Sequence, residues 1–548
     1  MSNWGIIDSD IHNVWHGVES VSILKFHQMP LWNPYMCGGG PMLAYPLSNI
    51  LYPGFLLILL FKPIVGFKIG ILVHLIIGLV GSWFLARKLR IGFPANLLVP
   101  FVYMLSSTYF LYSSVGFVFG FGIALIPWVF FFYLKSLKDK KNLIFCALIC
   151  CFMLFNGSIY HLSYVFLFLF LYAFFSSIKD RNLSPLKIFI AIIVIFVIVG
   201  SIKVFPMIDS YSNSWRIETT DEYTSWGLTK DSLLSRDQGI FSKHNFEFSP
   251  QSKGKLWDWW EYGAYIGIIP LILFLVGCFT CWKKRWPLIV SGLIFLLISL
   301  EELVPLNLYA FIHKLPVYNS LYVAARYQIL FIFSLAIVSA LALDKLQRKN
   351  VLKYSISLLL VLFVLIDLLL VNGPIIADSF KQEPIEPTQI TEFQQYQAGN
   401  KYNNSNSMMY INFLSNKGNI NCYPDSVPLQ TFAKSVKSSA YMGEFYYSSS
   451  DKKPVLIYWS PNKIVLESDL ENSNTIIVNQ NYKYGWRVFG ANDENVKSYS
   501  GLISTNVNSG NKKVTFYYLP SAFIKGSIVS FIAIIFIFVW LRRRIHKI

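Results

Sequence analysis

Residues 354–373 have the sequence YSISLLLVLFVLIDLLLVNG, in which Asp367 is the single charged residue. An α-helix of this length is about 30 Å long, which matches the hydrocarbon thickness of a bilayer. Comparable apolar runs of roughly 17–21 residues recur along the chain. They are 67–86, 94–110, 114–134, 143–159, 160–177, 188–206, 263–281, 287–304, 323–343, 354–373 and 521–541. The sequence therefore predicts an all-α polytopic membrane protein with about 11 spans.

The composition points to lipid as the solvent of this chain. Its 548 residues are 54% hydrophobic and 14% charged, whereas soluble proteins carry about a quarter charged residues. The formal net charge of +17 does not indicate a nucleic-acid-binding protein, because the basic residues form short clusters between the apolar runs rather than one stripe. We therefore assign the positive charge to membrane topology.

The basic clusters predict the orientation of the spans. They lie at 87–90, 135–141, 179–187, 283–285, 345–353 and 542–544. With 11 spans and an outer N-terminus, all of them fall on one side, which is the cytoplasmic side by the positive-inside rule. This topology places 1–66, 207–262, 305–322 and 374–520 outside a cell (inner or plasma) membrane, with the C-terminus in the cytoplasm.

Two features near the N-terminus do not fit a simple span. Residues 1–45 are polar and follow no apolar run, so we expect a further helix before them, which would make 12 spans. The stretch 50–61 is apolar but short, and Pro53 lies inside it. A re-entrant or interfacial helix suits this stretch better than a span.

The outer segment 374–520 changes character, with more Asn and Ser and shorter apolar stretches. Candidate strands lie at 454–459, 463–467, 475–479, 486–489 and 513–518, separated by turn residues. We predict a small antiparallel β-sandwich-like domain before the last helix. It would either contact a glycan or substrate, or cap the outer loops structurally. The domains are then 1–373, a transmembrane domain with outer loops 1–66 and 207–262; 374–520, the β domain; and 521–548, a last helix with a basic tail.

The first outer loop is the richest in candidate site residues. They are Asp8, Asp10, His12, Trp15, Trp32, Asn33, Gly38, Gly39 and Gly40. Two carboxylates two residues apart can share a divalent cation, or one can act as a general base. The three glycines could bring N–H groups to a phosphate, or form a plain turn. Cys37 and Cys422 both fall outside, where a disulfide could form, although nothing in the sequence pairs them.

Further candidates follow later in the chain, at Glu261, Tyr262 and Arg326. Aromatic residues beside acids suit stacking on a sugar ring, and equally suit the belt at a membrane interface. Arg326 could bind a phosphate with its planar fork, or anchor its helix. The second outer loop also holds Trp215, Arg216, Glu218, Asp221 and Glu222.

The acidic pair in the first outer loop, about 20 residues before the PLWNPYMCGGGP segment at 30–41, resembles the YfhO-like family of bacterial membrane proteins. These belong to the GT-C superfamily of polytopic glycosyltransferases. The resemblance continues in YGAYIG at 262–267, ARY at 325–327 and YKYGW at 482–486. It covers nearly the whole chain, and segment 30–41 is its most specific part.

The resemblance implies a GT-C-like fold with 12 spans and an activity outside the membrane. The enzymes of the family take a sugar from a polyprenyl-phosphate donor, and the acceptor here would be a cell-envelope glycan, teichoic acid or lipid. An acidic residue in the first outer loop is the expected base. Its distance to Pro30 favours Asp8, whereas the D-x-H-x-x-W pattern favours Asp10, and both stay open. A divalent cation could bind at the same two residues.

The alternative function is non-enzymatic. The chain would then be a lipid or polysaccharide translocase, or an envelope assembly factor that binds glycans through its β domain. A transporter needs charged residues near the middle of the membrane, whereas an enzyme of this kind needs its acids in the outer loops. The placement of Asp8 and Asp10 favours the enzyme.

Overall fold

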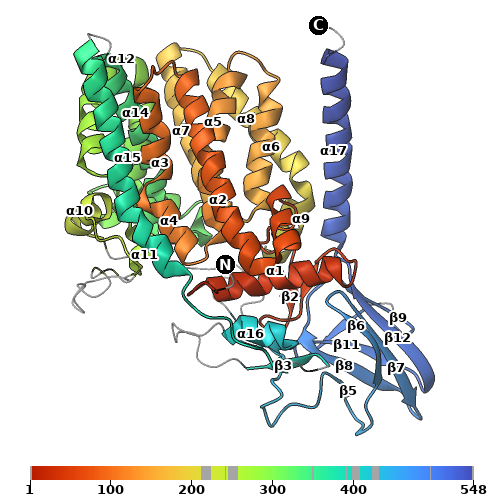
Figure 1. The fold of residues 1–548 in the computed structure, drawn as a ribbon. Coiled ribbons are helices and arrows are strands. Elements are labelled where there is room, and N and C mark those ends of the chain that lie inside the picture. Colours follow the sequence, from red (N-terminus) through yellow and green to blue (C-terminus); the bar gives the residue numbers. More distant parts are fainter. Residues whose placement is uncertain are drawn as a thin grey trace. The chain divides into compact units, whose positions relative to one another are not determined.

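The computed structural model describes residues 3–211, 224–240, 242, 244, 257–347, 351–388, 390, 392–397, 408–422, 431–493 and 495–545 (Figure 1). The chain divides into two compact units. We call Met1–Phe67, Val197–Trp215 and Gln382–Ile548 the β-domain unit, and Lys68–Phe196 and Arg216–Lys381 the helical unit. Each is described below by itself.

The helices and strands have the following bounds. The helices are α1 (Ser9–Leu24), α2 (Leu56–Lys88), α3 (Leu98–Met104), α4 (Ser107–Ser114), α5 (Ile126–Ser136), α6 (Asn142–Phe155), α7 (Ile159–Asp180), α8 (Ser184–Val199), α9 (Ser201–Tyr211), α10 (Trp226–Leu234), α11 (Trp259–Tyr262), α12 (Ile268–Ser299), α13 (Leu308–Ile312), α14 (Gln328–Gln347), α15 (Val351–Ser379), α16 (Met408–Leu414) and α17 (Ser521–Ile545). The strands are β1 (Trp32–Asn33), β2 (Gly40–Pro41), β3 (Gln394–Tyr396), β4 (Lys417–Asn419), β5 (Phe445–Tyr447), β6 (Val455–Ser460), β7 (Lys463–Leu470), β8 (Asn474–Asn481), β9 (Trp486–Phe489), β10 (Lys497–Tyr499), β11 (Leu502–Val507) and β12 (Gly510–Tyr518).

Long apolar helices confirm a multi-pass membrane protein. In the part of the chain that the structure describes, seven helices are long and apolar enough to cross a membrane. The count rises to eight if α8 and α9, which follow each other after a short break, are counted as one span. The predicted run 143–159 corresponds to α6, which is shorter because it ends before Asn156 and Gly157. The figure of 11 spans stays a prediction.

One helical element, α12, overlaps both of the predicted runs 263–281 and 287–304. Its Pro270 and Leu288 carbonyls accept hydrogen bonds from Ser339 and Ser334 of α14. In a straight helix those carbonyls would be about 27 Å apart, whereas the two serines are separated by only about 7.5 Å. Hence α12 doubles back along α14, and the basic residues 283–285 lie in the stretch where it turns.

Basic helix ends meet at one end of the helical unit. The Lys179 ammonium donates to the Lys284 carbonyl over 3.0 Å, and Arg285 reaches the Leu89 carbonyl at 3.5 Å. Lys345, at the end of α14, bonds to the Thr280 carbonyl. Since α14 is about 30 Å long, Arg326 before its first residue lies at the opposite end of the helix. This arrangement agrees with the predicted grouping of the basic clusters.

A break inside α2 separates the predicted short apolar stretch 50–61 from the long helix that follows it. Lys62 has φ 65° and ψ 165° inside α2, and Pro63 follows it. A Cβ atom on Gly66 would lie 2.5 Å from the Leu57 carbonyl oxygen, so the chain folds back tightly there. A helix therefore begins at Leu56 and is interrupted at Lys62, as expected for a separate short element.

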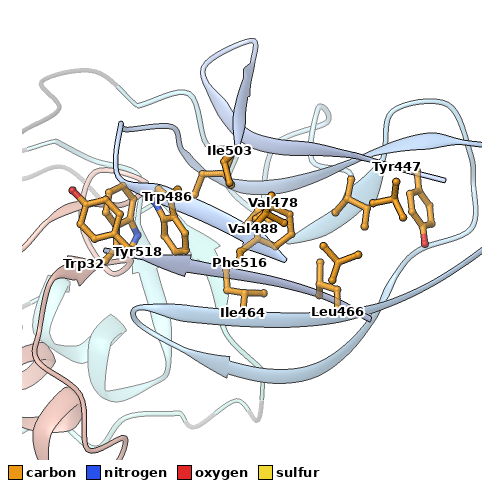
Figure 2. Packing of buried hydrophobic residues seen from close by; sticks show 14 of the residues in the cluster. Trp32, Tyr447, Ile464, Leu466, Val478, Trp486, Val488, Ile503, Phe516 and Tyr518 are labelled. Atoms are coloured by element: carbon orange, nitrogen blue, oxygen red, sulfur yellow. The ribbon is translucent and has the colours of Figure 1, made fainter. Parts of the chain in front are cut away.

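The β domain contains two four-stranded sheets, with strand orders β10-β11-β8-β5 and β6-β7-β12-β9. All of their pairings are antiparallel. Buried side chains from both sheets form one core, which includes Val478 and Ile503 of the first sheet and Phe516 of the second (Figure 2). Each of the five predicted strands overlaps an observed one, and β5, β10 and β11 were not predicted. The small β domain is thus confirmed, with the core of a sandwich.

The N-terminal segment supplies a further part of this core. Trp32 is completely buried beside Trp486 and Tyr518 (Figure 2). Its indole N–H donates to the Gln480 side chain over 2.8 Å. The Asn462 side chain accepts hydrogen bonds from the backbone of Leu31 and Trp32. The predicted boundaries at 373 and 520 stay predictions, but the β domain folds around a residue from the first outer loop.

A disulfide joins the same two regions. Cys37 and Cys422 are bonded, with their Cα atoms 4.3 Å apart and a sequence separation of 385. The structure therefore contains the disulfide that the sequence analysis left open. Structural disulfides persist in oxidising compartments, which agrees with an outer location for both segments.

Replacing Trp32 by alanine tests this packing. We expect Trp32→Ala to lower the free energy of unfolding of the β domain by about 3–5 kcal/mol, because it empties a large buried site. Thermal unfolding and limited proteolysis of the full-length protein in detergent measure the effect. Tyr484→Ala is the matched control, since this side chain is 67% exposed. Equal stability of the two variants would contradict the assignment of Trp32 to the core.

Candidate functional site

The acids of the first outer loop lie at the start of a helix that the sequence analysis did not foresee. Asp8 is the N-cap of α1, and Asp10 lies in its first turn. Acidic side chains are favourable there because the N-terminus of a helix carries partial positive charge. Both side chains are half-buried. The signal available in the sequence was this acidic start followed by sixteen residues without proline.

Asp10 is held by the backbone of a second helix. Its carboxylate accepts hydrogen bonds from the N–H groups of Met409 and Tyr410, at 3.0 and 2.8 Å, in the first turn of α16. The helices pack closely, because a Cβ atom on Gly17 would lie 2.3 Å from the Phe413 ring. Burial raises the pKa of Asp10 to about 6, although the two N–H groups oppose the change. The carboxylate is therefore ionised above pH 6, with a proton affinity suited to a general base.

His12 and Trp15 belong to the buried surface of α1. The His12 ring lies edge-on to Trp15, with centroids 4.6 Å apart, and Trp15 packs on Tyr45 at 4.5 Å. Burial lowers the pKa of His12 well below its usual value, and the neighbouring His16 lowers it further. His12 is thus neutral at pH 7.

A polar cluster on the same face of α1 was missed from the sequence. Glu19 is fully buried and accepts a hydrogen bond from the Ser48 hydroxyl at 2.7 Å. Lys203 of α9 donates to the Ser48 carbonyl, and His16 contacts the Asn49 side chain at 2.9 Å. Burial raises the pKa of Glu19 to about 7, and the Ser48 bond and the charge of Lys203 oppose that rise. The spacing 12, 16, 19 was a usable signal, but only once a helix was assigned there.

The three glycines are used for packing within the protein. The N–H of Gly38 donates to the Asn419 carbonyl at 3.2 Å, and that of Gly39 donates to Met36 at 2.9 Å. A Cβ atom on Gly38 would lie 2.3 Å from the Thr431 side chain. Gly40 pairs with Asn33 in the β1–β2 ladder. The plain turn accounts for this segment, because these two N–H groups do not point to a phosphate.

The aromatic and amide candidates of the segment are structural as well. Trp32 belongs to the β-domain core, and the Asn33 side chain accepts the backbone N–H of Tyr35 at 2.9 Å. Both residues are buried. Neither presents a surface to a substrate in this structure.

Glu261 and Arg326 form a buried ion pair in the helical unit. The guanidinium donates through Nε and Nη2 to the two carboxylate oxygens, at 2.7 and 2.5 Å, and the side chains are only 5% and 3% exposed. The arrangement is a planar fork on a carboxylate. The Tyr262 carbonyl beside it accepts from Ser232 and Gln328. Arg326 is therefore neutralised by the protein, and the helix-anchor interpretation fits it better than phosphate binding.

Aromatic rings enclose this pair. The guanidinium carbon lies 4.8 Å from the Tyr160 ring centre, 5.0 Å from Phe119 and 5.1 Å from Tyr322. Trp257 stacks on Tyr322 with ring centres 5.2 Å apart. The rings that enclose the guanidinium come from other parts of the chain than the aromatic segment 257–262, and they stabilise the arginine.

Metal binding finds no support in the described ranges. Within them, no group of three or more His, Cys, Asp or Glu side chains could hold a metal ion. The candidates Trp215, Arg216, Glu218, Asp221 and Glu222 lie outside the described residues.

No protein-family model matches this chain, and no curated protein matches it either.

The ion pair can be tested by removing one partner at a time. We expect Glu261→Gln and Arg326→Met each to lower stability by about 3–5 kcal/mol, because each leaves a buried group without its partner. Glu261→Met combined with Arg326→Met should recover part of that loss. Thermal unfolding in detergent measures all three.

Arg236→Ala is the control for these variants. Arg236 pairs with Asp367 but is 57% exposed, so its loss should cost less than about 1 kcal/mol. Single variants of the buried pair that are no less stable than this control would contradict its structural role.

Proposed function

We propose that this multi-pass membrane protein is a GT-C-type glycosyltransferase of the YfhO-like family. It transfers a sugar from a polyprenyl-phosphate donor to a cell-envelope glycan, teichoic acid or lipid. The reaction takes place at the outer face of the cell membrane, beside α1 and the β domain.

The observation that carries the proposal is the environment of Asp10. Its carboxylate is fixed by two backbone N–H groups of α16, and its pKa of about 6 lies near the working pH. A base is most effective when its pKa is close to the operating pH. Asp8 lies two residues earlier, at the N-cap of α1, and raises the pKa of Asp10 by its charge.

The proposed step follows from this assignment. The Asp10 carboxylate takes the proton of the acceptor hydroxyl while the hydroxyl oxygen forms a bond to the anomeric carbon of the sugar. The bond from that carbon to the phosphate oxygen breaks, and the polyprenyl phosphate leaves with the electron pair. Attack from the opposite side inverts the configuration. The phosphate is a fair leaving group, so a base and correct positioning suffice.

Outer placement of the β domain is part of the proposal. Within the β-domain unit, α17 begins at Ser521 after the β domain (Figure 1). Its sequence has Lys525 near the start and the cluster 542–544 at the other end. Its 25 residues span about 37 Å, enough to place the two ends on opposite sides of a bilayer. The Cys37–Cys422 disulfide also favours an oxidising, outer compartment.

Transfer of labelled sugar tests the activity and the base. Membranes with the wild-type chain should transfer sugar from polyprenyl-phosphate donors, and Asp10→Asn should lower the rate by a factor of about 10²–10⁴. Asp8→Asn should have a smaller effect. The wild-type rate should fall as the pH drops through about 6, because protonation removes the base.

Expression and melting temperature are compared for both variants, since Asp10 also caps α16. Transfer that vanishes only in Asp8→Asn would move the base to Asp8. Transfer that persists in both variants would reject the mechanism, and the absence of transfer from every donor would favour the translocase or assembly-factor alternative.

Cysteine labelling tests the topology separately. In a variant without Cys146, Cys150, Cys151, Cys278 and Cys281, a membrane-impermeant maleimide should label Tyr484→Cys in intact cells. Lys140→Cys should react only after the cells are opened. Both positions are exposed, so access rather than burial decides the result. The reverse pattern would invert the proposed orientation.

A further inference from the structure

A cavity of about 230 Å³ opens at the basic end of the helical unit. Most of its lining comes from the end of α7, the start of α8 and the turning stretch of α12, and Phe130 of α5 adds to it. The residues that matter here are Tyr172, Ser176, Lys179, Lys284, Arg285 and Leu288. None of them belongs to the proposed catalytic site.

The cavity carries more positive than negative charge. Lys179, Lys284 and Arg285 line it together with a single carboxylate, that of Asp180, which lies 3.9 Å from Lys179. Among the described residues, no carboxylate lies within 4.0 Å of the charged nitrogens of Lys284 or Arg285. The Arg285 guanidinium is half-buried and makes a long contact of 3.5 Å with the Leu89 carbonyl. Among the described residues, these two adjacent cations therefore make no direct ion pair, and Asp180 is the one carboxylate that lines the cavity with them.

Apolar surface adjoins these charges. Phe130, Tyr172 and Leu288 form part of the wall. Ile178 and Leu183, on either side of the chain turn between α7 and α8, are 54% and 61% exposed. Exposed leucine and isoleucine side chains near two adjacent cations fit a molecule with an anionic headgroup and apolar tails better than a soluble anion.

We propose that this cavity binds the headgroup of an anionic glycerophospholipid. The phosphodiester would lie between Lys284 and Arg285, and the acyl chains would follow the exposed side chains near Ile178 and Leu183. Basic pockets between membrane helices bind such headgroups through charge and through the planar donors of arginine. The bound lipid would neutralise the turning stretch of α12, where cations lie close to lipid. The site does not depend on the proposed glycosyl transfer.

The test compares an anionic with a zwitterionic lipid that differ only in the headgroup. Native mass spectrometry of the full-length protein in detergent gives the apparent affinity for phosphatidylglycerol and for phosphatidylethanolamine with identical acyl chains. We expect phosphatidylglycerol to bind more tightly. The double variant Lys284→Gln/Arg285→Gln should weaken this binding by roughly 30-fold, since each cation near the surface contributes about 1 kcal/mol.

The control removes the same charge elsewhere. Lys140→Gln/Lys141→Gln alters two cations that do not line the cavity, and binding should stay within about twofold of the wild type because charge near the headgroup, not total charge, decides it. Equal loss in both double variants, or no loss in the first, would overturn the site. A competition experiment adds glycerol phosphate or inorganic phosphate as a soluble anion. If either displaces phosphatidylglycerol at equal concentration, the ligand is a free anion and the lipid assignment fails.

Discussion

The burial of Trp32 in the core of the β domain is the contact on which the rest of the β-domain unit depends. It draws a segment from the first outer loop between two sheets that begin more than 400 residues later. The Asn462 and Gln480 side chains and the Cys37–Cys422 disulfide fix the same arrangement. Because the chain is anchored in this way, α1 and α16 lie against each other, and the candidate base is held by tertiary structure rather than by a loop.

The face of α1 illustrates how burial prepares acidic groups for chemistry. Removing a carboxylate from water raises its pKa, and hydrogen bonds or a nearby cation limit the rise. Asp10 and Glu19 both follow this rule, with pKa values of about 6 and 7. They differ in surroundings: Asp10 is half-buried and meets backbone N–H groups, whereas Glu19 is enclosed and faces Lys203. This difference is why Asp10 is the proposed base and Glu19 is better suited to hold α1 against α9.

The helical unit separates two kinds of charge along its helices. At one end of α14, Arg326 is enclosed by aromatic rings and neutralised by Glu261. At the other end, Lys284 and Arg285 line a cavity and have no carboxylate within 4.0 Å among the described residues. A charge buried within the bundle must be paired because the cost of desolvation is high, whereas a charge near the membrane surface can meet a lipid headgroup. Arginine therefore anchors a helix at one end, as Arg326, and lines a candidate lipid site at the other, as Arg285.

The sequence by itself determined the membrane class, the clustering of basic residues between apolar runs, and five of the strands of the β domain. These features follow from local composition and periodicity, which short segments carry without tertiary contacts. It did not foresee α1, the core position of Trp32, the packing role of Gly38 or the Glu261–Arg326 pair. Each of these depends on partners far away in the chain, from 65 residues for the ion pair to 448 for Trp32 and Gln480. Only the tertiary structure decides such pairs, because the free energy of burying a polar or bulky group depends on what is packed against it.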